Sequence, residues 1–204
     1  MAHLERLRQF IAEFTTLAAT HGRDEAAMLD RGAALLGALV AHDDWLPDEA
    51  TVPDPVYYRQ YLLHCDPLER FSVVSFVWGP GQRTPVHDHC TWGMVGMLRG
   101  AERCRRFARP APGAPLQVAG EYRLEPGAVD RLSPTEGDIH EVSNALDDRV
   151  SISVHVYGAN IGAVSRHVYD PATGEEKPFV SGYSSAQVPN LWDRSAEVRA
   201  TLAR

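Results

Sequence analysis

The chain has 204 residues, enough for one domain with a substantial core, and we expect a single domain over 1–204. Its 44% hydrophobic and 23% charged residues are typical of a soluble globular protein. The formal net charge of −7 argues against general binding to nucleic acid or to anionic membranes, and no apolar run is long enough to span a bilayer. Three cysteines without a CxxC pattern, and an N-terminus without an apolar signal segment, predict a cytoplasmic protein.

Two helices are predicted in the N-terminal part, 1–45. Apolar residues recur at helical spacing from Leu4 to Ala18, Gly22 ends this helix, and Asp24 is suited to cap the next one. The Ala- and Leu-rich stretch Ala27–Val40 predicts the second helix. Neither helix carries chemistry, so we expect both to cover one side or edge of the remaining structure.

A proline-rich connection, Trp45–Pro55, precedes a change to alternating hydrophobicity at Tyr57. Many short strands separated by Gly- and Pro-rich turns predict an all-β sandwich or barrel over 57–183, followed by a tail, 184–204, that contains Trp192 and a short helix at Ala196–Leu202. Beyond the strand at Tyr58–Leu63, the predicted strands are Phe71–Trp78, Pro85–His89, Trp92–Leu98, Glu102–Phe107, Leu116–Ala119, Glu121–Leu124, Val129–Leu132, Asp138–Val142, Val150–Tyr157, Val164–Tyr169 and Lys177–Tyr183.

Three histidines are candidate metal ligands. His87 and His89 are separated by one residue, so on a strand both imidazoles point to one face and Asp88 to the other. His140 follows Gly137 and supplies a third neutral nitrogen donor. A divalent ion held by three neutral donors keeps its full charge and open positions, which favours an anionic ligand such as a thiolate. The donor set suits iron, with zinc as the rival metal.

The glycines around these histidines resemble the two motifs of the cupin superfamily. The first motif is matched in spacing by the stretch from Gly81 to Gly100, in which five residues separate Gly81 from His87-x-His89, three lead on to Gly93 and six to Gly100. Gly93 stands where that motif normally has Glu. His140 lies in Gly137-x-x-His140-x-x-x-Asn144, which matches the core of the second motif. The resemblance implies a jelly-roll β-barrel with the N-terminal helices packed outside.

A second group of polar residues shares one face of a single predicted strand. Ser153, His155 and Tyr157 follow one another at steps of roughly 6.5–7 Å, and the long His and Tyr side chains can close that gap. The phenol could then donate a hydrogen bond toward the metal, with His155 and Ser153 orienting it. The other face of this strand is apolar, so the polar face could instead be the outer one.

Together with the strand Tyr58-Arg59-Gln60-Tyr61, these residues resemble the cysteine dioxygenase family of thiol dioxygenases over about residues 57 to 183. The resemblance implies that ferrous iron, held by three histidines, binds a small thiol and O₂, and that both oxygen atoms go onto sulfur to give a sulfinate. The iron ligands implied are His87, His89 and His140. The relay residues outside the metal's ligand set are Tyr157, His155 and Ser153.

Two departures from the family pattern matter, one at Gly93 and one at Gln60. At the position of Gly93, mammalian-type members have a cysteine that is linked by a thioether to the tyrosine matching Tyr157. Glycine has no side chain, so no such link can form here. Gln60 stands where cysteine-selective members have an arginine, which resembles the bacterial branch of 3-mercaptopropionate dioxygenases. In that branch an arginine at the position of Arg166 is the carboxylate partner, with Tyr58 close by; alternatively, Arg166 is solvated at the barrel edge. We expect 3-mercaptopropionate as the first substrate and L-cysteine as the second.

Two other functions remain open on the sequence. A zinc cupin such as an isomerase would need a general base, for which no carboxylate is clearly placed. A cupin that only senses a small ligand would have no need of the Ser-His-Tyr set.

Overall fold

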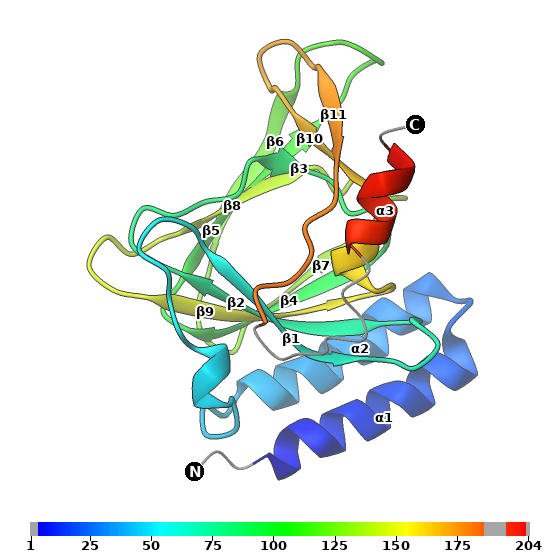
Figure 1. Ribbon diagram of the computed structural model, residues 1–204, viewed down its shortest axis with the longest axis vertical. Coiled ribbons are helices and arrows are strands. Elements are labelled where there is room, and N and C mark those ends of the chain that lie inside the picture. The colour runs from blue at the N-terminus through cyan, green and yellow to red at the C-terminus, as the bar shows by residue number, and fades with distance from the viewer. Residues whose placement is uncertain (1–3, 186–194, 203–204) are drawn as a thin grey trace.

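The computed structural model describes residues 4–185 and 195–202, so the part of the predicted tail around Trp192 lies outside the described residues. Two β-sheets face each other across the molecule, and two long helices lie against the outer side of one of them (Figure 1). The helices are α1 (Glu5–His21) and α2 (Glu25–Val40), and a short C-terminal helix, α3 (Ser195–Leu202), lies at the other end of the chain. The predicted all-β cupin core with N-terminal helices outside is confirmed.

All strand pairs are antiparallel. The five-stranded sheet has the order β1 (Arg59–Cys65), β2 (Ser72–Trp78), β9 (Ser151–Tyr157), β4 (Gly93–Arg99) and β7 (Val129–Leu132). The six-stranded sheet has the order β11 (Glu176–Phe179), β10 (Arg166–Tyr169), β3 (Val86–His87), β8 (His140–Asn144), β5 (Glu102–Ala108) and β6 (Gln117–Leu124).

The helices form because their apolar residues share one face and because α2 has a good cap. The side chain of Asp24 accepts a hydrogen bond of 3.0 Å from the backbone N–H of Ala27, as predicted. Gly32 and Gly96 allow α2 and β4 to approach closely, since a Cβ at Gly96 would lie 2.9 Å from Leu36 Cγ. Between α2 and β1 the proline-rich connection contains a single 3₁₀ turn, Asp48–Ala50.

The central strand β9 is buried on both faces. Ile152, Val154 and Val156 point outward and pack in one apolar cluster with the helices. The alternate residues therefore point inward, between the two sheets. This settles which face of the strand is interior: the face with Ser153 and His155 belongs to the inside of the barrel.

Several predicted strands differ from the structure in their bounds. Two strands were predicted at Leu116–Ala119 and Glu121–Leu124, but β6 runs through both without a break. Gly120 belongs to the strand because it pairs with Arg106, and the register shifts only after this pair. In the segment Pro85–His89 only Val86 and His87 belong to β3, and Cys90 turns the chain with φ of 54°. The last strand ends at Phe179, before Gly182, which has φ of 70°.

Among the residues that the structure describes, no helix has both the length and the apolar character needed to cross a membrane.

We expect Leu36→Ala to lower the free energy of unfolding by about 2–5 kcal/mol, because it opens a cavity in the interface between helix and sheet. Leu36 is fully buried in that interface. The matched control is Leu68→Ala, whose side chain is 74% exposed and should change stability by less than about 0.5 kcal/mol. Urea denaturation measures the free energy of unfolding of both variants. Equal, small losses of this free energy would show that the helices do not pack on the sheet as described.

Candidate metal centre

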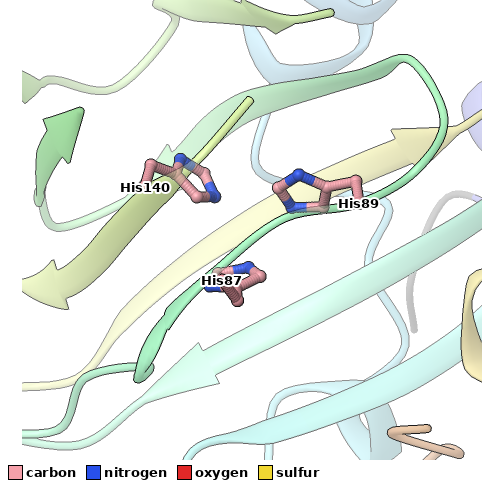
Figure 2. Close-up of side chains that lie close together, drawn as sticks. All are labelled: His87, His89 and His140. Carbon is pink, nitrogen blue, oxygen red and sulfur yellow. The ribbon is translucent and has the colours of Figure 1, made fainter. Parts of the chain in front are cut away.

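The structure brings the three candidate histidines together inside the barrel. His87 ends β3 and pairs with His140, which begins β8 in the same sheet, while His89 follows two residues after His87. Their ring centroids are 4.8 Å apart for His87 and His89, 4.8 Å for His87 and His140, and 4.9 Å for His89 and His140. Figure 2 shows the three rings facing a common space. One ligand atom from each lies within 4.8 Å of the other two.

Neighbouring groups lie within contact distance of the Nδ1 atoms of His87 and His140. His87 Nδ1 lies 3.0 Å from the carbonyl oxygen of Pro85, which can only accept, so this nitrogen carries the proton and Nε2 has a free lone pair. His140 Nδ1 lies 3.5 Å from Cys104 Sγ. His89 is held through its backbone N–H, which donates to Asp138 Oδ2 at 2.8 Å. Such partners set the tautomer and the orientation of metal-binding histidines.

Burial keeps these imidazoles neutral. It lowers the pKa of His87 to about 4, with the nearby positive charge of Arg166 as the next cause. Burial also places the pKa values of His89 and His140 well below the usual range. Neither buried ring nitrogen of His89 has a hydrogen-bond partner, and Asp138 Oδ2 lies 3.6 Å from its Nδ1. Three neutral donors, one of them otherwise unsatisfied, fit a divalent ion such as iron or zinc.

Asp88 points away from the cluster, as its position between the two histidines predicts. Its carboxylate accepts hydrogen bonds from the backbone N–H of His167 at 2.7 Å and from the Tyr169 hydroxyl at 2.7 Å, and it lies 2.9 Å from His167 Nδ1. Cys90 completes a second set of donor atoms there. These contacts already satisfy the Asp88 carboxylate. We therefore interpret them as structural contacts that hold the backbone between His87 and His89 in place.

Ser153, His155 and Tyr157 form a continuous hydrogen-bonded row. Ser153 Oγ lies 2.8 Å from His155 Nε2, and His155 Nδ1 lies 2.8 Å from the Tyr157 hydroxyl. The Tyr157 ring stacks beside His89 with a centroid distance of 5.4 Å, so the row leads up to the histidine cluster. Burial lowers the pKa of His155 to about 3 and raises the pKa of Tyr157. At neutral pH the row is therefore made of neutral groups.

Two residues that the sequence did not single out extend this row. Trp78 Nε1 donates to Ser153 Oγ at 3.2 Å from the neighbouring strand β2. Burial raises the pKa of Glu102, on β5 of the opposite sheet, to about 7, and Ser153 and Trp78 oppose this rise. The alternation Glu102-Arg103-Cys104-Arg105 was a signal that Glu102 and Cys104 share a face, but it does not tell which face is buried.

Arg166 is buried rather than solvated at the barrel edge. Its side chain is at the start of β10, and the residue is only 4% exposed. One terminal nitrogen donates to Ser181 Oγ at 2.8 Å, and the guanidinium lies 4.6 Å from the ring centroid of Phe179. Its Nε has no partner, and within the described residues it forms no ion pair with an acidic side chain. The structure thus places a buried positive charge without a bonded counter-ion next to the histidines.

Gln60 and Tyr58 lie on the inward face of β1 and of the residues just before it. The Tyr58 ring stacks on Trp78 with a centroid distance of 4.8 Å and interacts with the charge of Arg166. Gln60 Nε2 donates to the carbonyl oxygen of Gly182 at 2.7 Å, one residue from the Ser181 that binds Arg166. The segment 181–183 therefore connects Gln60 to Arg166.

Gly93 lies against the ring of Tyr157. A Cβ at this position would be 2.9 Å from Tyr157 Cδ1, closer than side chains normally approach. Cys90, the nearest cysteine in sequence, is exposed and has its recorded sulfur contacts with Asp88 and His167. Tyr157 therefore has a glycine, and no thiol, at the position where the family resemblance implies a thioether partner.

Solved structures similar to this chain include cupin and double-stranded β-helix proteins. A double-stranded β-helix domain protein of Klebsiella pneumoniae is 15% identical with a TM-score of 0.45; the match covers 67% of this chain and 97% of that one. A cupin 2 conserved barrel domain protein of Salinispora arenicola is 19% identical with a TM-score of 0.41; the match covers 57% of this chain and 87% of that one.

The family comparison covers the histidines and the Ser-His-Tyr row together. The sequence model that matches is that of cysteine dioxygenase type I, over residues 54–170, which is more than half of the chain. The matched range begins before β1 and includes all three histidines of the cluster, the Ser-His-Tyr row and Arg166. The chain belongs to the cysteine dioxygenase type I family, a family of thiol dioxygenases.

Proposed function

We propose that this protein is an iron-dependent thiol dioxygenase that converts a small thiol carboxylate to its sulfinate, with 3-mercaptopropionate preferred over L-cysteine. The observation that carries the proposal is the buried guanidinium of Arg166, unpaired with any acidic side chain of the described residues, beside three neutral histidines. Leaving a charge buried without a partner costs several kcal/mol, so the site is suited to receive an anion. A thiol carboxylate supplies a carboxylate for Arg166 and a sulfur for the metal.

His87, His89 and His140 would hold the metal through their Nε2 atoms, while Pro85, Asp138 and Cys104 orient the rings. A bound ferrous ion would supply the redox chemistry that joins O₂ to sulfur, which no side chain of the chain can provide. Iron is proposed over zinc because the family is one of dioxygenases. A zinc isomerase remains the rival function, and the metal bound by the purified protein distinguishes the two.

The substrate preference is proposed from the positions of the two residues near Ser181. Arg166 offers a guanidinium, which binds a carboxylate with two parallel hydrogen bonds. Gln60 is neutral, and its amide N–H already donates to Gly182. The carboxyl carbon is the third carbon from sulfur in both 3-mercaptopropionate and L-cysteine, so Arg166 would bind either carboxylate and the α-ammonium group makes the difference. The ammonium group of L-cysteine would gain no acidic partner and would stand near the charge of Arg166.

Tyr157 is proposed to bind and orient the reacting groups from the pocket side. Its hydroxyl is fixed by His155, and its ring is fixed between His89 and Gly93. Because burial raises its pKa, the phenol keeps its proton at neutral pH. It can therefore donate a hydrogen bond beside the histidine cluster without adding negative charge there, whereas a sensor protein would have no use for such a group.

We expect His87→Ala, His89→Ala and His140→Ala each to lose most bound metal and all thiol oxidation, because two ligands remain of three. The control is His42→Ala, which changes an exposed histidine on the surface and should keep full metal content. Metal content by mass spectrometry and O₂ uptake with 3-mercaptopropionate measure both effects. Full iron and normal turnover in any one of the three variants would contradict the assignment.

Tyr157→Phe should keep the metal but lower kcat by roughly 100-fold, since removing one positioned donor costs about 3 kcal/mol. Tyr61→Phe is the matched control, because its hydroxyl donates to Val52 on the outer side of the barrel. An unchanged kcat at saturating thiol in Tyr157→Phe would exclude the proposed role.

The third expectation concerns substrate choice. Arg166→Ala should lower kcat/KM for 3-mercaptopropionate by about 30-fold or more, corresponding to about 2 kcal/mol for one partner of a buried ion pair. The same variant should barely affect 2-aminoethanethiol, which has no carboxylate. Gln60→Arg should narrow or reverse the preference for 3-mercaptopropionate over L-cysteine. Steady-state O₂ consumption with the three thiols checks this, and an equal loss for all three would refute a carboxylate role for Arg166.

A further inference from the structure

The segment from His87 to Cys90 presents side chains to both sides of the barrel wall. His87 and His89 point inward and form part of the histidine cluster, whereas Asp88 points away from it and Cys90 is exposed. Strand β10 lies directly beside β3 (Figure 1), and its residue His167 reaches the Asp88 carboxylate. A second group of potential metal ligands, Asp88, Cys90 and His167, therefore lies behind the histidine cluster.

The donor atoms of this second group are close enough to bind one ion. Cys90 Sγ lies 3.7 Å from Asp88 Oδ1 and 3.9 Å from His167 Nδ1, and His167 Nδ1 lies 2.9 Å from Asp88 Oδ2. In a tetrahedral zinc site, bonds of about 2.3 Å to sulfur and about 2.0–2.1 Å to nitrogen or oxygen place the ligand atoms roughly 3.3–3.6 Å apart. The three donors therefore need to move by roughly half an ångström or less to meet that geometry.

The Asp88 carboxylate has hydrogen-bond contacts of two kinds. The first kind comes from the backbone N–H of His167 and the Tyr169 hydroxyl, at 2.7 Å each, and these donors orient the carboxylate. The second kind involves Cys90 Sγ and His167 Nδ1, which become metal ligands when an ion takes the place of their protons. The carboxylate therefore stays fixed by the first pair when the second pair turns to an ion.

We propose that Asp88, Cys90 and His167 form a second metal site, on the outer side of the barrel, for a divalent ion of the zinc class. A thiolate sulfur and an imidazole nitrogen favour such an ion over magnesium or calcium, which prefer oxygen ligands. Cys90 is exposed, and the side chain of His167 is 36% exposed. The ion therefore enters from solvent and keeps a water molecule as its fourth ligand.

Binding of the ion releases one proton. The S–H bond of Cys90 breaks, its electron pair binds the ion, and the proton goes to solvent. A neutral His167 moves its own proton from Nδ1 to Nε2, with no net release. The site thus gains one positive charge in total. Asp138 supplies a further negative charge that acts on Cys90 and opposes the positive charge of Arg166, which acts there too.

An ion at this site fastens the segment that carries His89 to strand β10. The backbone N–H of Asp88 already donates to the carbonyl oxygen of His167 at 3.1 Å, on one side of His89. Coordination by Cys90 and His167 adds a link on the other side of His89. Because the ion binds the folded chain, in which these ligands are assembled, it should stabilise the protein against unfolding.

The test is a titration of the metal-free, full-length protein with Co²⁺, which replaces zinc in such sites and absorbs light. The wild type should bind two ions per chain, and one of them should give the near-ultraviolet charge-transfer band of a cobalt–thiolate bond. The histidine cluster offers only nitrogen ligands, so it gives no such band. Absence of the band at saturating Co²⁺ would overturn the proposal.

Variants assign the band to the proposed ligands. Cys90→Ser should lose the thiolate band, and His167→Ala should lose the ion that gives it. His42→Ala, which changes an exposed histidine, is the matched control and should keep the band and both ions. A band that persists in Cys90→Ser would come from another cysteine, and it would overturn the proposal, as would unchanged binding in His167→Ala.

The effect on stability is measured in His140→Ala, in which the second site is complete and the histidine cluster is not. Zn²⁺ should raise the temperature of thermal unfolding of this variant as its concentration increases. The double variant His140→Ala/Cys90→Ser should show no such rise. An equal rise in both would show that Zn²⁺ binds elsewhere and would reject the site.

These readouts need neither substrate nor turnover, so they are independent of the proposed function. A thiolate band that remains in His140→Ala, in a protein without thiol oxidation, would refute the proposed function and support the second site. An active enzyme without the band would refute the second site alone. If His167→Ala does not fold, Cys90→Ser still decides, because it replaces an exposed thiol with a hydroxyl of similar size.

Discussion

The exclusion of water from the inside of the barrel is the constraint on which the candidate site depends. Burial lowers the pKa of His87 and of the other two clustered histidines, so that all three are neutral donors at physiological pH. The same burial encloses the guanidinium of Arg166, which has no ion pair with an acidic side chain of the described residues, and it raises the pKa of Glu102 to about 7. A buried interior thus combines neutral nitrogen donors at the three histidines with a positive charge at Arg166 that no acidic side chain of the described residues pairs with.

The architecture enforces this dryness through the two faces of β9. Its outward face, with Val154 at its centre, packs on helices α1 and α2, which close that side of the sheet (Figure 1). Its inward face aims Ser153, His155 and Tyr157 at the second sheet, where the histidines and Glu102 lie. The N-terminal helices carry no chemistry, yet they cover the strand that carries the hydrogen-bonded row. One face of β9 therefore packs against the helices, and the other face carries the Ser-His-Tyr row.

Much of the fold and part of the candidate site were predictable, because they depend on local spacing. The alternation around His155 placed three polar groups in one row, and the period of 3.6 residues predicted both N-terminal helices. Contacts between strands far apart in the sequence have no such signal: Cys104 meets His140 only because β5 and β8 pair in one sheet. Burial of Arg166 likewise follows from β10 lying beside β3, which pairing between distant strands determines. The ligand, relay and substrate roles of these residues stay predictions that the experiments address.

The central claim is that His87, His89 and His140 together hold the metal. Anomalous diffraction at the iron absorption edge, from crystals of the iron-loaded protein with 3-mercaptopropionate, tests it most directly. The account predicts one strong peak about 2.1 Å from each of the three Nε2 atoms, with the substrate carboxylate at Arg166. A peak at Asp88, Cys90 and His167 instead, or no peak among the three histidines, would contradict it.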